Sequence, residues 1–238
     1  GLSLLPVALV LRRKGWVHVG PVKPLWWAGP LLGLVLFGGA SLQQVGLVFT
    51  TAGKAGFITG LYVILVPLVG LFWGQRAGMG AWIGALLAVA GLYLLSVTDA
   101  MSIEYGDLLV LVGAFFWTGH VQLIGWLSKR VDTLLLSVTQ FMVCAVLSLV
   151  VALFTETIST PTLLQAAPAI LYGGLLSVGV AYTLQIVAQR TARPSHAAIL
   201  LSLESAFAAL GGWLLLSEQL TPRALLGCGL MMAGMLIS

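Results

Sequence analysis

Long apolar runs alternate with short polar turns along this chain. Cutting the sequence at the turns gives one partial helix, 1–11, and eight full helices. The full helices are predicted at 25–49, 55–73, 79–97, 106–127, 133–154, 164–188, 195–216 and 222–238. Most of these runs reach the roughly 20 residues that an α-helix needs to cross a bilayer. The pattern therefore predicts an all-α, polytopic helix bundle.

Composition places that bundle in a membrane. The 238 residues are 60% hydrophobic and 8% charged, whereas a soluble domain carries about 25% charged residues. The runs lack the strict alternation of barrel strands, so they favour membrane helices. Cys144 and Cys228 lie inside apolar runs and are interpreted as packing residues, not as a disulfide or a metal pair.

A repeat lies within the pattern. The stretch 197–238 falls on 54–95, without a gap, when it is shifted by 143 positions. Ala198 then meets Ala55, Gly227 meets Gly84, and Gly234 meets Gly91. Two copies of one helical hairpin indicate a protein built from two related halves, which we place at 1–98 and 99–238.

Basic residues predict the topology. If the end of the partial helix lies in the cytoplasm, nine basic residues fall inside and only Lys54 and Arg223 fall outside. The inner residues are Arg12, Arg13, Lys14, Lys23, Arg76, Lys129, Arg130, Arg190 and Arg193. This positive-inside pattern predicts a multi-pass plasma (inner) membrane protein with a cytoplasmic C-terminus.

The same topology inverts the two halves, because the turns that precede the two hairpins lie on opposite sides of the membrane. Running the repeat backwards leaves the first helix and part of the second unaccounted for in the first half. We therefore expect a truncated N-terminus and ten helices in the complete protein. Inverted halves are the structural basis of alternating access around a site near the midplane.

Two runs carry a family resemblance. Residues 199–230 and 52–68 resemble the matching hairpin segments of EamA-type domains in the drug/metabolite transporter superfamily. The resemblance implies ten helices in two inverted five-helix halves, and secondary transport, usually export of small metabolites such as amino acids. Leu203-Glu204-Ser205 replaces the family's usual Leu-Glu-Pro, so a proline kink there is expected to be lost or moved.

Glu204 is the acid that we place deep in the membrane, about ten residues into its helix. A charged acid at that depth costs roughly 2.5–3.5 kcal/mol on insertion scales. It should therefore face a cavity or become protonated. It is a candidate site for a substrate amine or a proton, and the alternative is a hydrogen-bonded packing residue.

Lys54 and His120 are the next candidates. Lys54 begins the helix 55–73, where it could hold a substrate carboxylate or gate the outer mouth, or snorkel to the headgroups. His120 follows Trp117 by three positions, so the two side chains share a helix face. Gln122 lies three or four positions from neither of them, so it is not on that face. Substrate contact or proton relay competes with a neutral histidine bonded to a neighbouring helix.

Amides and aromatic residues complete the candidate site. Gln43 and Gln44 lie on helix 25–49, and Gln185 and Gln189 lie on the matching helix 164–188. Amides in hydrocarbon need partners, so they face the bundle or line a pore. The candidate cavity aromatics, for which plain packing is the alternative, are Tyr62, Trp117, Tyr182 and Trp213.

Glycines at four-residue spacing have a structural interpretation. They are Gly56/Gly60, Gly70/Gly74/Gly78 and Gly80/Gly84. Such spacing allows helices to approach closely, and we expect it to mark packing inside one molecule.

These patterns predict a secondary transporter that exports small metabolites by alternating access, driven by an ion gradient or by the substrate's own gradient. The alternatives are a channel or facilitator, a non-transporting scaffold, or a membrane enzyme. His18, His120 and His196 lie far apart, and no Gly-x-x-x-x-Gly-Lys-Ser/Thr run occurs. We expect no cofactor, no metal and no nucleic acid. The expected partners are a small-molecule substrate, the lipid bilayer and a proton as coupling ion, in a monomer or homodimer.

Overall fold

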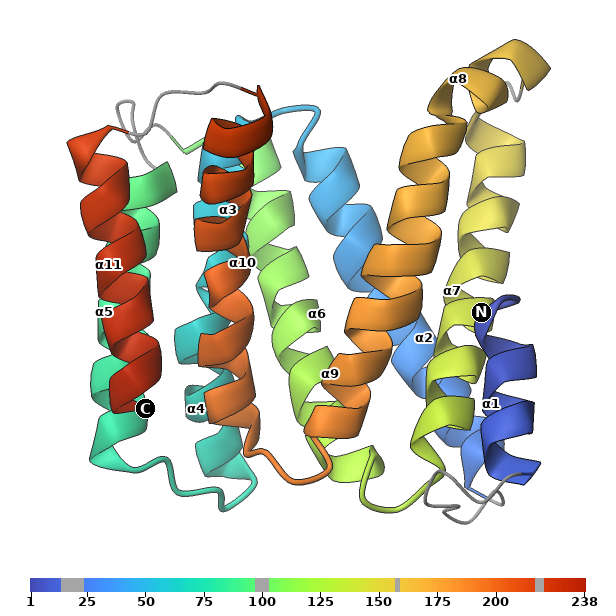
Figure 1. The fold of residues 1–238 in the computed structure, drawn as a ribbon, viewed down its shortest axis with the longest axis horizontal. Coiled ribbons are helices and arrows are strands. Elements are labelled where there is room, and N and C mark those ends of the chain that lie inside the picture. Colours follow the sequence, from blue (N-terminus) through green and yellow to red (C-terminus); the bar gives the residue numbers. More distant parts are fainter. Residues whose placement is uncertain (14–23, 97–102, 157–158, 217–220) are drawn as a thin grey trace. The chain divides into compact units, whose positions relative to one another are not determined.

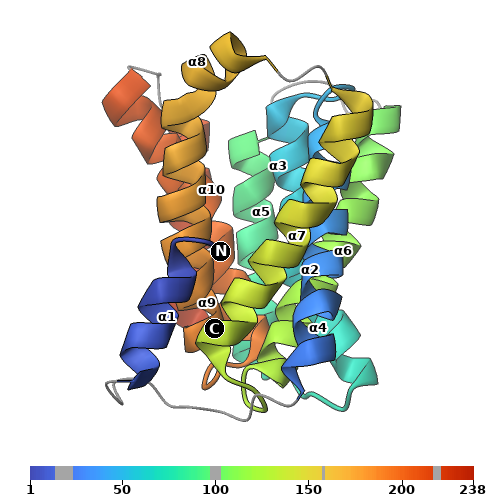
Figure 2. The same cartoon turned by 90° about the vertical axis from the view of Figure 1, so that its right-hand side faces the viewer.

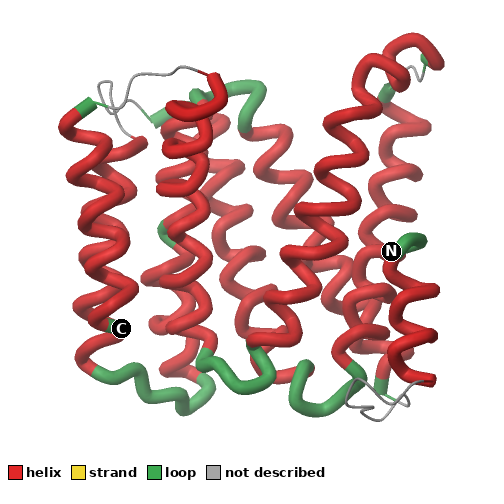
Figure 3. Tube along the Cα trace, in the orientation of Figure 1, coloured by secondary structure: helices red, strands yellow, loops and turns green. Residues whose placement is uncertain are grey.

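The computed structural model describes residues 1–13, 24–96, 103–156, 159–216 and 221–238, in which the regular elements are helices (Figures 1 and 3). Their bounds are α1 Leu4–Arg13, α2 Leu25–Gly46, α3 Ala52–Gly60, α4 Tyr62–Phe72, α5 Met79–Ser96, α6 Tyr105–Leu127, α7 Thr133–Thr155, α8 Thr160–Leu171, η1 Tyr172–Tyr182, α9 Thr183–Ala188, α10 Pro194–Leu216 and α11 Pro222–Ile237. Lys14, His18, Lys23 and the predicted boundary between the halves at 98 lie outside the described residues.

The all-α prediction is confirmed, and most predicted helix ends lie within a few residues of the observed ones. Six spans in the described ranges are long and apolar enough to cross a membrane, with 52–72 and 160–188 each counted as one span. Two predicted helices are subdivided. The run 55–73 divides at Leu61, whose N–H bonds to the Ile58 carbonyl, and the run 164–188 contains the eleven-residue π-helix η1.

Side-chain caps explain several helix starts. The Thr51 hydroxyl accepts from the Lys54 N–H, the Asp132 carboxylate accepts from the Leu135 N–H, and the Thr221 hydroxyl accepts from the Ala224 N–H. Each cap satisfies a backbone donor that the first helical turn leaves without a partner. The short polar turns therefore place the helix ends as well as interrupt the apolar runs.

The chain forms two compact units. Unit 1 comprises residues 1–37 and 123–191, and unit 2 comprises 38–122 and 192–238, so α2 and α6 contribute to both. In unit 1, Leu32, Ile124, Leu136 and Ile186 form a buried core. A second cluster around Ala8 packs α1 against α7 (Figure 1).

The core of unit 2 is built around α5 and its neighbours α4, α10 and α11. Leu92 and Met231 are fully buried where α5, α10 and α11 meet, and Ile199 of α10 is buried against α4 and α5. Helix α3 also lies beside α5 (Figure 2). These contacts position α10, on which the candidate residues Glu204 and Trp213 lie.

Helices α5 and α11 pack against each other in unit 2 and lie side by side in Figure 1. A Cβ on Gly91 would lie 2.5 Å from the Gly227 carbonyl oxygen, and one on Gly227 would lie 2.7 Å from the Gly91 oxygen. Gly84 and Gly234 face each other in the same way, at 2.5 and 2.6 Å. Because Gly84 faces Gly234 while Gly91 faces Gly227, the two helices run antiparallel.

The predicted packing role of the spaced glycines is correct for some and wrong for others. A Cβ on Gly60 would clash with Leu92, and one on Gly80 would approach the Ile237 carbonyl oxygen to 2.6 Å. Gly74 and Gly78 instead have open space around them. Gly74 has a φ of +69°, which favours glycine, and it terminates α4.

Candidate functional site

A polar cluster joins α2 and α6 within unit 2. Trp117 Nε1 donates a hydrogen bond of 3.1 Å to Gln43 Oε1. The Trp117 ring also packs edge-on against His120, with ring centroids 6.1 Å apart. The His120 side chain is buried. Three predicted site residues therefore lie together, because Trp117 contacts both the Gln43 amide and the His120 imidazole.

A second polar contact ties α4 to α6. Gln122, fully buried, donates from Nε2 to the Val66 carbonyl oxygen at 2.7 Å. Its Oε1 accepts from Gln75 Nε2 at 2.9 Å. Gly70 leaves room for this pair, since a Cβ there would lie 2.9 Å from the Gln75 Oε1 atom. Gln75 was not among the predicted site residues. A second amide at the end of the neighbouring helix could have indicated a partner for Gln122.

Lys54 lies in a charged network at the N-terminal ends of α3 and α6. Its amine is 3.3 Å from Glu104 Oε1 and 4.0 Å from Asp107 Oδ2. The Thr50 hydroxyl and the Glu104 N–H also donate to the Asp107 carboxylate. Lys54 is only 15% exposed, whereas Glu104 is 49% exposed. Lys54, which was predicted to bind a substrate carboxylate or to gate the outer mouth, therefore already faces two carboxylates of the protein.

Glu204 lies on the side of α10 that faces away from the core of unit 2. Its neighbours Leu203 and Ala206 pack against α5 and α11, but Glu204 itself is exposed. It shares this face with Leu200 and Phe207, which are also exposed. Helix α10 continues through Ser205 without interruption, in agreement with the loss of a proline there.

The remaining candidates have separate environments. Tyr62 packs into the buried clusters that α4 forms with α5, α6 and α10. Gln44 and Trp213 are exposed. Tyr182 and Gln185 belong to unit 1, where the Tyr182 ring packs edge-on against Phe141 at a centroid distance of 6.4 Å.

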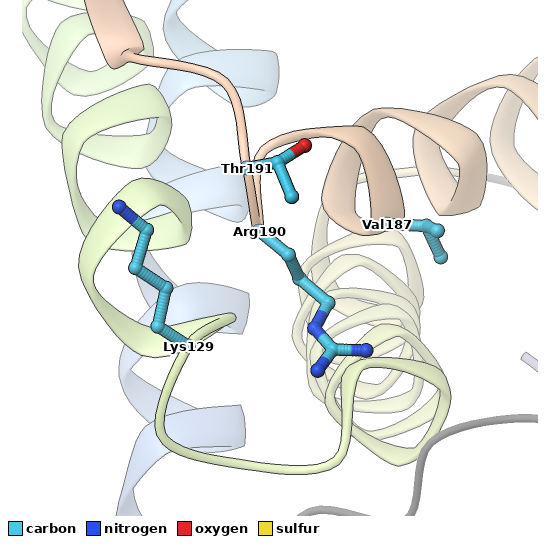
Figure 4. A pocket seen from close by; sticks show the side chains of 4 residues that line it. All are labelled: Lys129, Val187, Arg190 and Thr191. Carbon is cyan, nitrogen blue, oxygen red and sulfur yellow. The ribbon is translucent and has the colours of Figure 1, made fainter.

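A pocket of about 590 Å³ lies at the C-terminal ends of α6 and α9, inside unit 1. Lys129, Val187, Arg190 and Thr191 line it (Figure 4). Lys129 and Arg190 are two of the basic residues that predict the topology, and neither was predicted as a site residue. Within the described residues, no three side chains of His, Cys, Asp or Glu are grouped so as to hold a metal ion.

The apolar spans and buried polar contacts define a multi-pass membrane protein, and comparisons identify its relatives. The model of the EamA-like transporter family matches residues 104–238. An uncharacterized transporter of Archaeoglobus fulgidus is 34% identical over 228 residues, which cover 94% of this chain and 70% of that protein. The uncharacterized transporter YoaV of Bacillus subtilis is 25% identical, with coverage of 100% and 83%.

A solved structure, titled only as the crystal structure of a protein, has the same fold. It superposes with a TM-score of 0.78 at 19% sequence identity, covering 98% of this chain and 82% of that one. The chain belongs to the EamA-like transporter family. It is therefore a membrane transporter and not an enzyme.

Proposed function

We propose that this transporter is a secondary exporter of small metabolites, such as amino acids or related compounds, which works by alternating access between two inverted halves. Transport without nucleotide hydrolysis is consistent with the absence of a phosphate-binding loop motif from the sequence. A site near the bilayer midplane would open to each side in turn as the halves exchange conformations.

The observation that carries this proposal is the symmetry of the α5–α11 contact. A twofold axis requires each contact to recur between the counterparts of its two residues. The 143-residue shift turns the Gly84–Gly234 contact into Gly227–Gly91, and both contacts occur. The antiparallel course of the two helices fits an axis in the membrane plane, which an inverted repeat requires.

Two further contacts obey the same rule. The approach of Gly84 to Ser238 has its counterpart in the approach of Gly227 to Leu95. The approach of Gly91 to Met231 corresponds to that of Gly234 to Ala88. These approaches support two related halves that meet at α5 and α11, with the sequence boundary proposed at 98.

The proposed orientation rests on the basic loops. The excess of Lys and Arg on one side favours the plasma (inner) membrane with the C-terminus in the cytoplasm. The acidic network of Glu104 and Asp107 then lies on the outer side with Lys54. In this arrangement Lys54 gates the outer mouth through its two carboxylate partners.

We assign the substrate site to the polar groups of unit 2. Gln43, Trp117 and His120 provide hydrogen-bonding groups in one cluster on α2 and α6. Glu204 would bind a substrate amine or a coupling proton, because it is an exposed acidic residue of α10 that we place at mid-membrane depth. Tyr62, Gln44, Tyr182 and Gln185 are secondary candidates for contact along the pathway.

The test is flux through liposomes that hold the protein. A panel of labelled amino acids is measured for uptake and efflux, with and without a proton gradient. We expect saturable, gradient-dependent flux of at least one compound. Glu204→Gln should lower this flux by about tenfold or more, which corresponds to a loss of about 1.4 kcal/mol, because the variant lacks the charge that binds the amine or the proton.

Glu156→Gln is the matched control, because Glu156 ends α7 and is exposed. It removes one carboxylate that is not among the proposed site residues and should leave flux unchanged. A flux that is the same with and without the gradient, and the same in Glu204→Gln, would instead identify a channel or facilitator. No flux of any small metabolite in a folded, reconstituted protein would favour a scaffold.

A further inference from the structure

Two cations, Lys129 and Arg190, are among the described residues that line the pocket at the ends of α6 and α9. Lys129 and Arg190 lie on the turns that follow the two helices, and Thr191 adds a hydroxyl (Figure 4). Within the described part of the chain, neither Lys129 nor Arg190 takes part in an ion pair. In Figure 4 the Lys129 amine and the Arg190 guanidinium group extend in different directions from the turns that carry them.

Aromatic residues lie next to the turn that carries Lys129. Trp126 is 45% exposed, packs at a ring-centroid distance of 5.9 Å from Trp27, and carries the Arg130 guanidinium 4.2 Å above its ring. Tryptophan is enriched at the level of the lipid headgroups. An exposed tryptophan next to the turn that carries Lys129 therefore favours a position of the pocket at the depth of the lipid headgroups.

An apolar strip leads away from the pocket along α9. Val187 lines the pocket and is 41% exposed, and Leu184, one turn earlier, is 61% exposed. The combination of two cations, a hydroxyl and an adjoining apolar strip matches an amphiphilic anion: a phosphodiester headgroup beside the cations and an acyl chain along the strip.

We propose that this pocket binds the headgroup of an anionic phospholipid. Lys129 and Arg190 reach the phosphate by rotation of their long side chains, Thr191 donates a hydrogen bond to it, and Val187 with Leu184 contacts the acyl chain. The alternative is that the two cations only offset the negative ends of α6 and α9. That alternative predicts no preference for one lipid over another. The proposal does not depend on the transported substrate or on the direction of transport.

Native mass spectrometry of the purified protein in detergent tests this assignment. The protein is titrated with phosphatidylglycerol or with phosphatidylcholine of the same chain length. We expect preferential binding of phosphatidylglycerol and a loss of about 30-fold in the double variant Lys129→Gln/Arg190→Gln, because each cation near a lipid surface contributes roughly a factor of five.

Two control variants separate the pocket from total charge and from folding. Arg76→Gln/Arg223→Gln removes the same charge from two exposed positions outside the pocket and should keep the lipid preference. Lys129→Arg/Arg190→Lys keeps both charges in the pocket and should also keep it. An equal loss of binding in both charge-removing variants would contradict the proposal.

Inorganic phosphate distinguishes a lipid site from a site for a soluble anion. We expect millimolar phosphate to leave the bound phosphatidylglycerol in place, because the acyl chain adds contact along Val187 and Leu184. Displacement of the lipid by phosphate alone would overturn the lipid assignment. Equal binding of phosphatidylcholine by the unaltered protein would overturn it as well.

Discussion

Gln122 is the residue whose surroundings argue most clearly for a structural task. Its amide is fully buried and uses both ends, one on the Val66 carbonyl and one on Gln75. Interhelical hydrogen bonds of this kind stabilise a membrane bundle by roughly 0.6 kcal/mol on average, up to about 1.7 kcal/mol. Gln122 therefore holds α4 against α6 next to the proposed site.

Replacing Gln122 tests this role. Gln122→Leu removes two hydrogen bonds and leaves the Gln75 amide without its acceptor, so we expect a loss of about 1–2 kcal/mol in the free energy of unfolding. Denaturant unfolding in detergent micelles measures it. Gln44→Leu, on the exposed side of α2, should change stability by less than about 0.5 kcal/mol. Equal effects of the two substitutions would contradict the assignment.

The ion-pair partners of Lys54 could not be predicted from the sequence, although the position of Lys54 itself could. Its depth near a helix start could be read from the chain, and that placement is correct. The identity of its partners could not, because Glu104 lies 50 residues away and meets it only once α3 and α6 are packed. Pairing across such a separation depends on tertiary contacts, whereas capping by Thr51 depends on neighbours in sequence.

At the scale of elements, the α5–α11 contact depends on glycines that no other residue could replace without moving a helix. Around Gly227 the nearest atoms are the Gly91 carbonyl and the Leu95 nitrogen, both of the opposing backbone. Backbone atoms in a helix cannot rotate aside as a side chain can. A methyl group at Gly227 must therefore separate α5 from α11.

Two glycines in α11 form a matched test of this contact. Gly227→Ala should destabilise the protein by about 1–3 kcal/mol, as overpacking of a tight contact does. Gly229→Ala, in the same helix with open space around it, should be neutral or stabilising by up to about 1 kcal/mol, since alanine favours helix. Thermal unfolding in detergent compares the two. A stable Gly227→Ala variant would show that the contact is loose.

Helix η1 was not predictable from the sequence. Its apolar run 164–188 was read as one α-helix, and length and hydropathy do support one span there. The π-winding of Tyr172–Tyr182 is a difference of one residue per hydrogen-bonded turn. Gly173 and Gly174 lie in open space within this segment. Among the described residues no neighbouring helix packs against them, so the sequence carries no change in apolar spacing that would indicate a π-helix.

At the scale of the whole molecule, most of the architecture was readable from the sequence because membrane helices must satisfy their backbone groups internally. Apolar length and turn residues were sufficient to place all eight full helical runs. The candidate site was less accessible. Gln43, Trp117 and His120 could be named, but their contact depends on how α2 crosses α6.

The proposed twofold relation makes a prediction for paired substitutions. Gly91 and Gly234 are counterparts under the 143-residue shift and face equivalent backbone atoms, the carbonyls of Gly227 and Gly84. Gly91→Ala and Gly234→Ala should therefore lower unfolding free energy by similar amounts, each about 1–3 kcal/mol. Unfolding in micelles measures both, with Gly211→Ala, in open space, as a neutral reference. A large effect at one position only would count against the symmetry.

The glycine contacts between α5 and α11 also limit how the protein can evolve. A larger residue at Gly84, Gly91, Gly227 or Gly234 would meet the backbone of the opposite helix. A smaller partner cannot compensate for it, because the partner is already a glycine. At many helix contacts a larger residue can be accommodated when its partner becomes smaller. Such paired substitutions are not possible at these four positions. Among proteins that retain this contact, we expect these four sites to stay small while the surrounding apolar residues diverge freely.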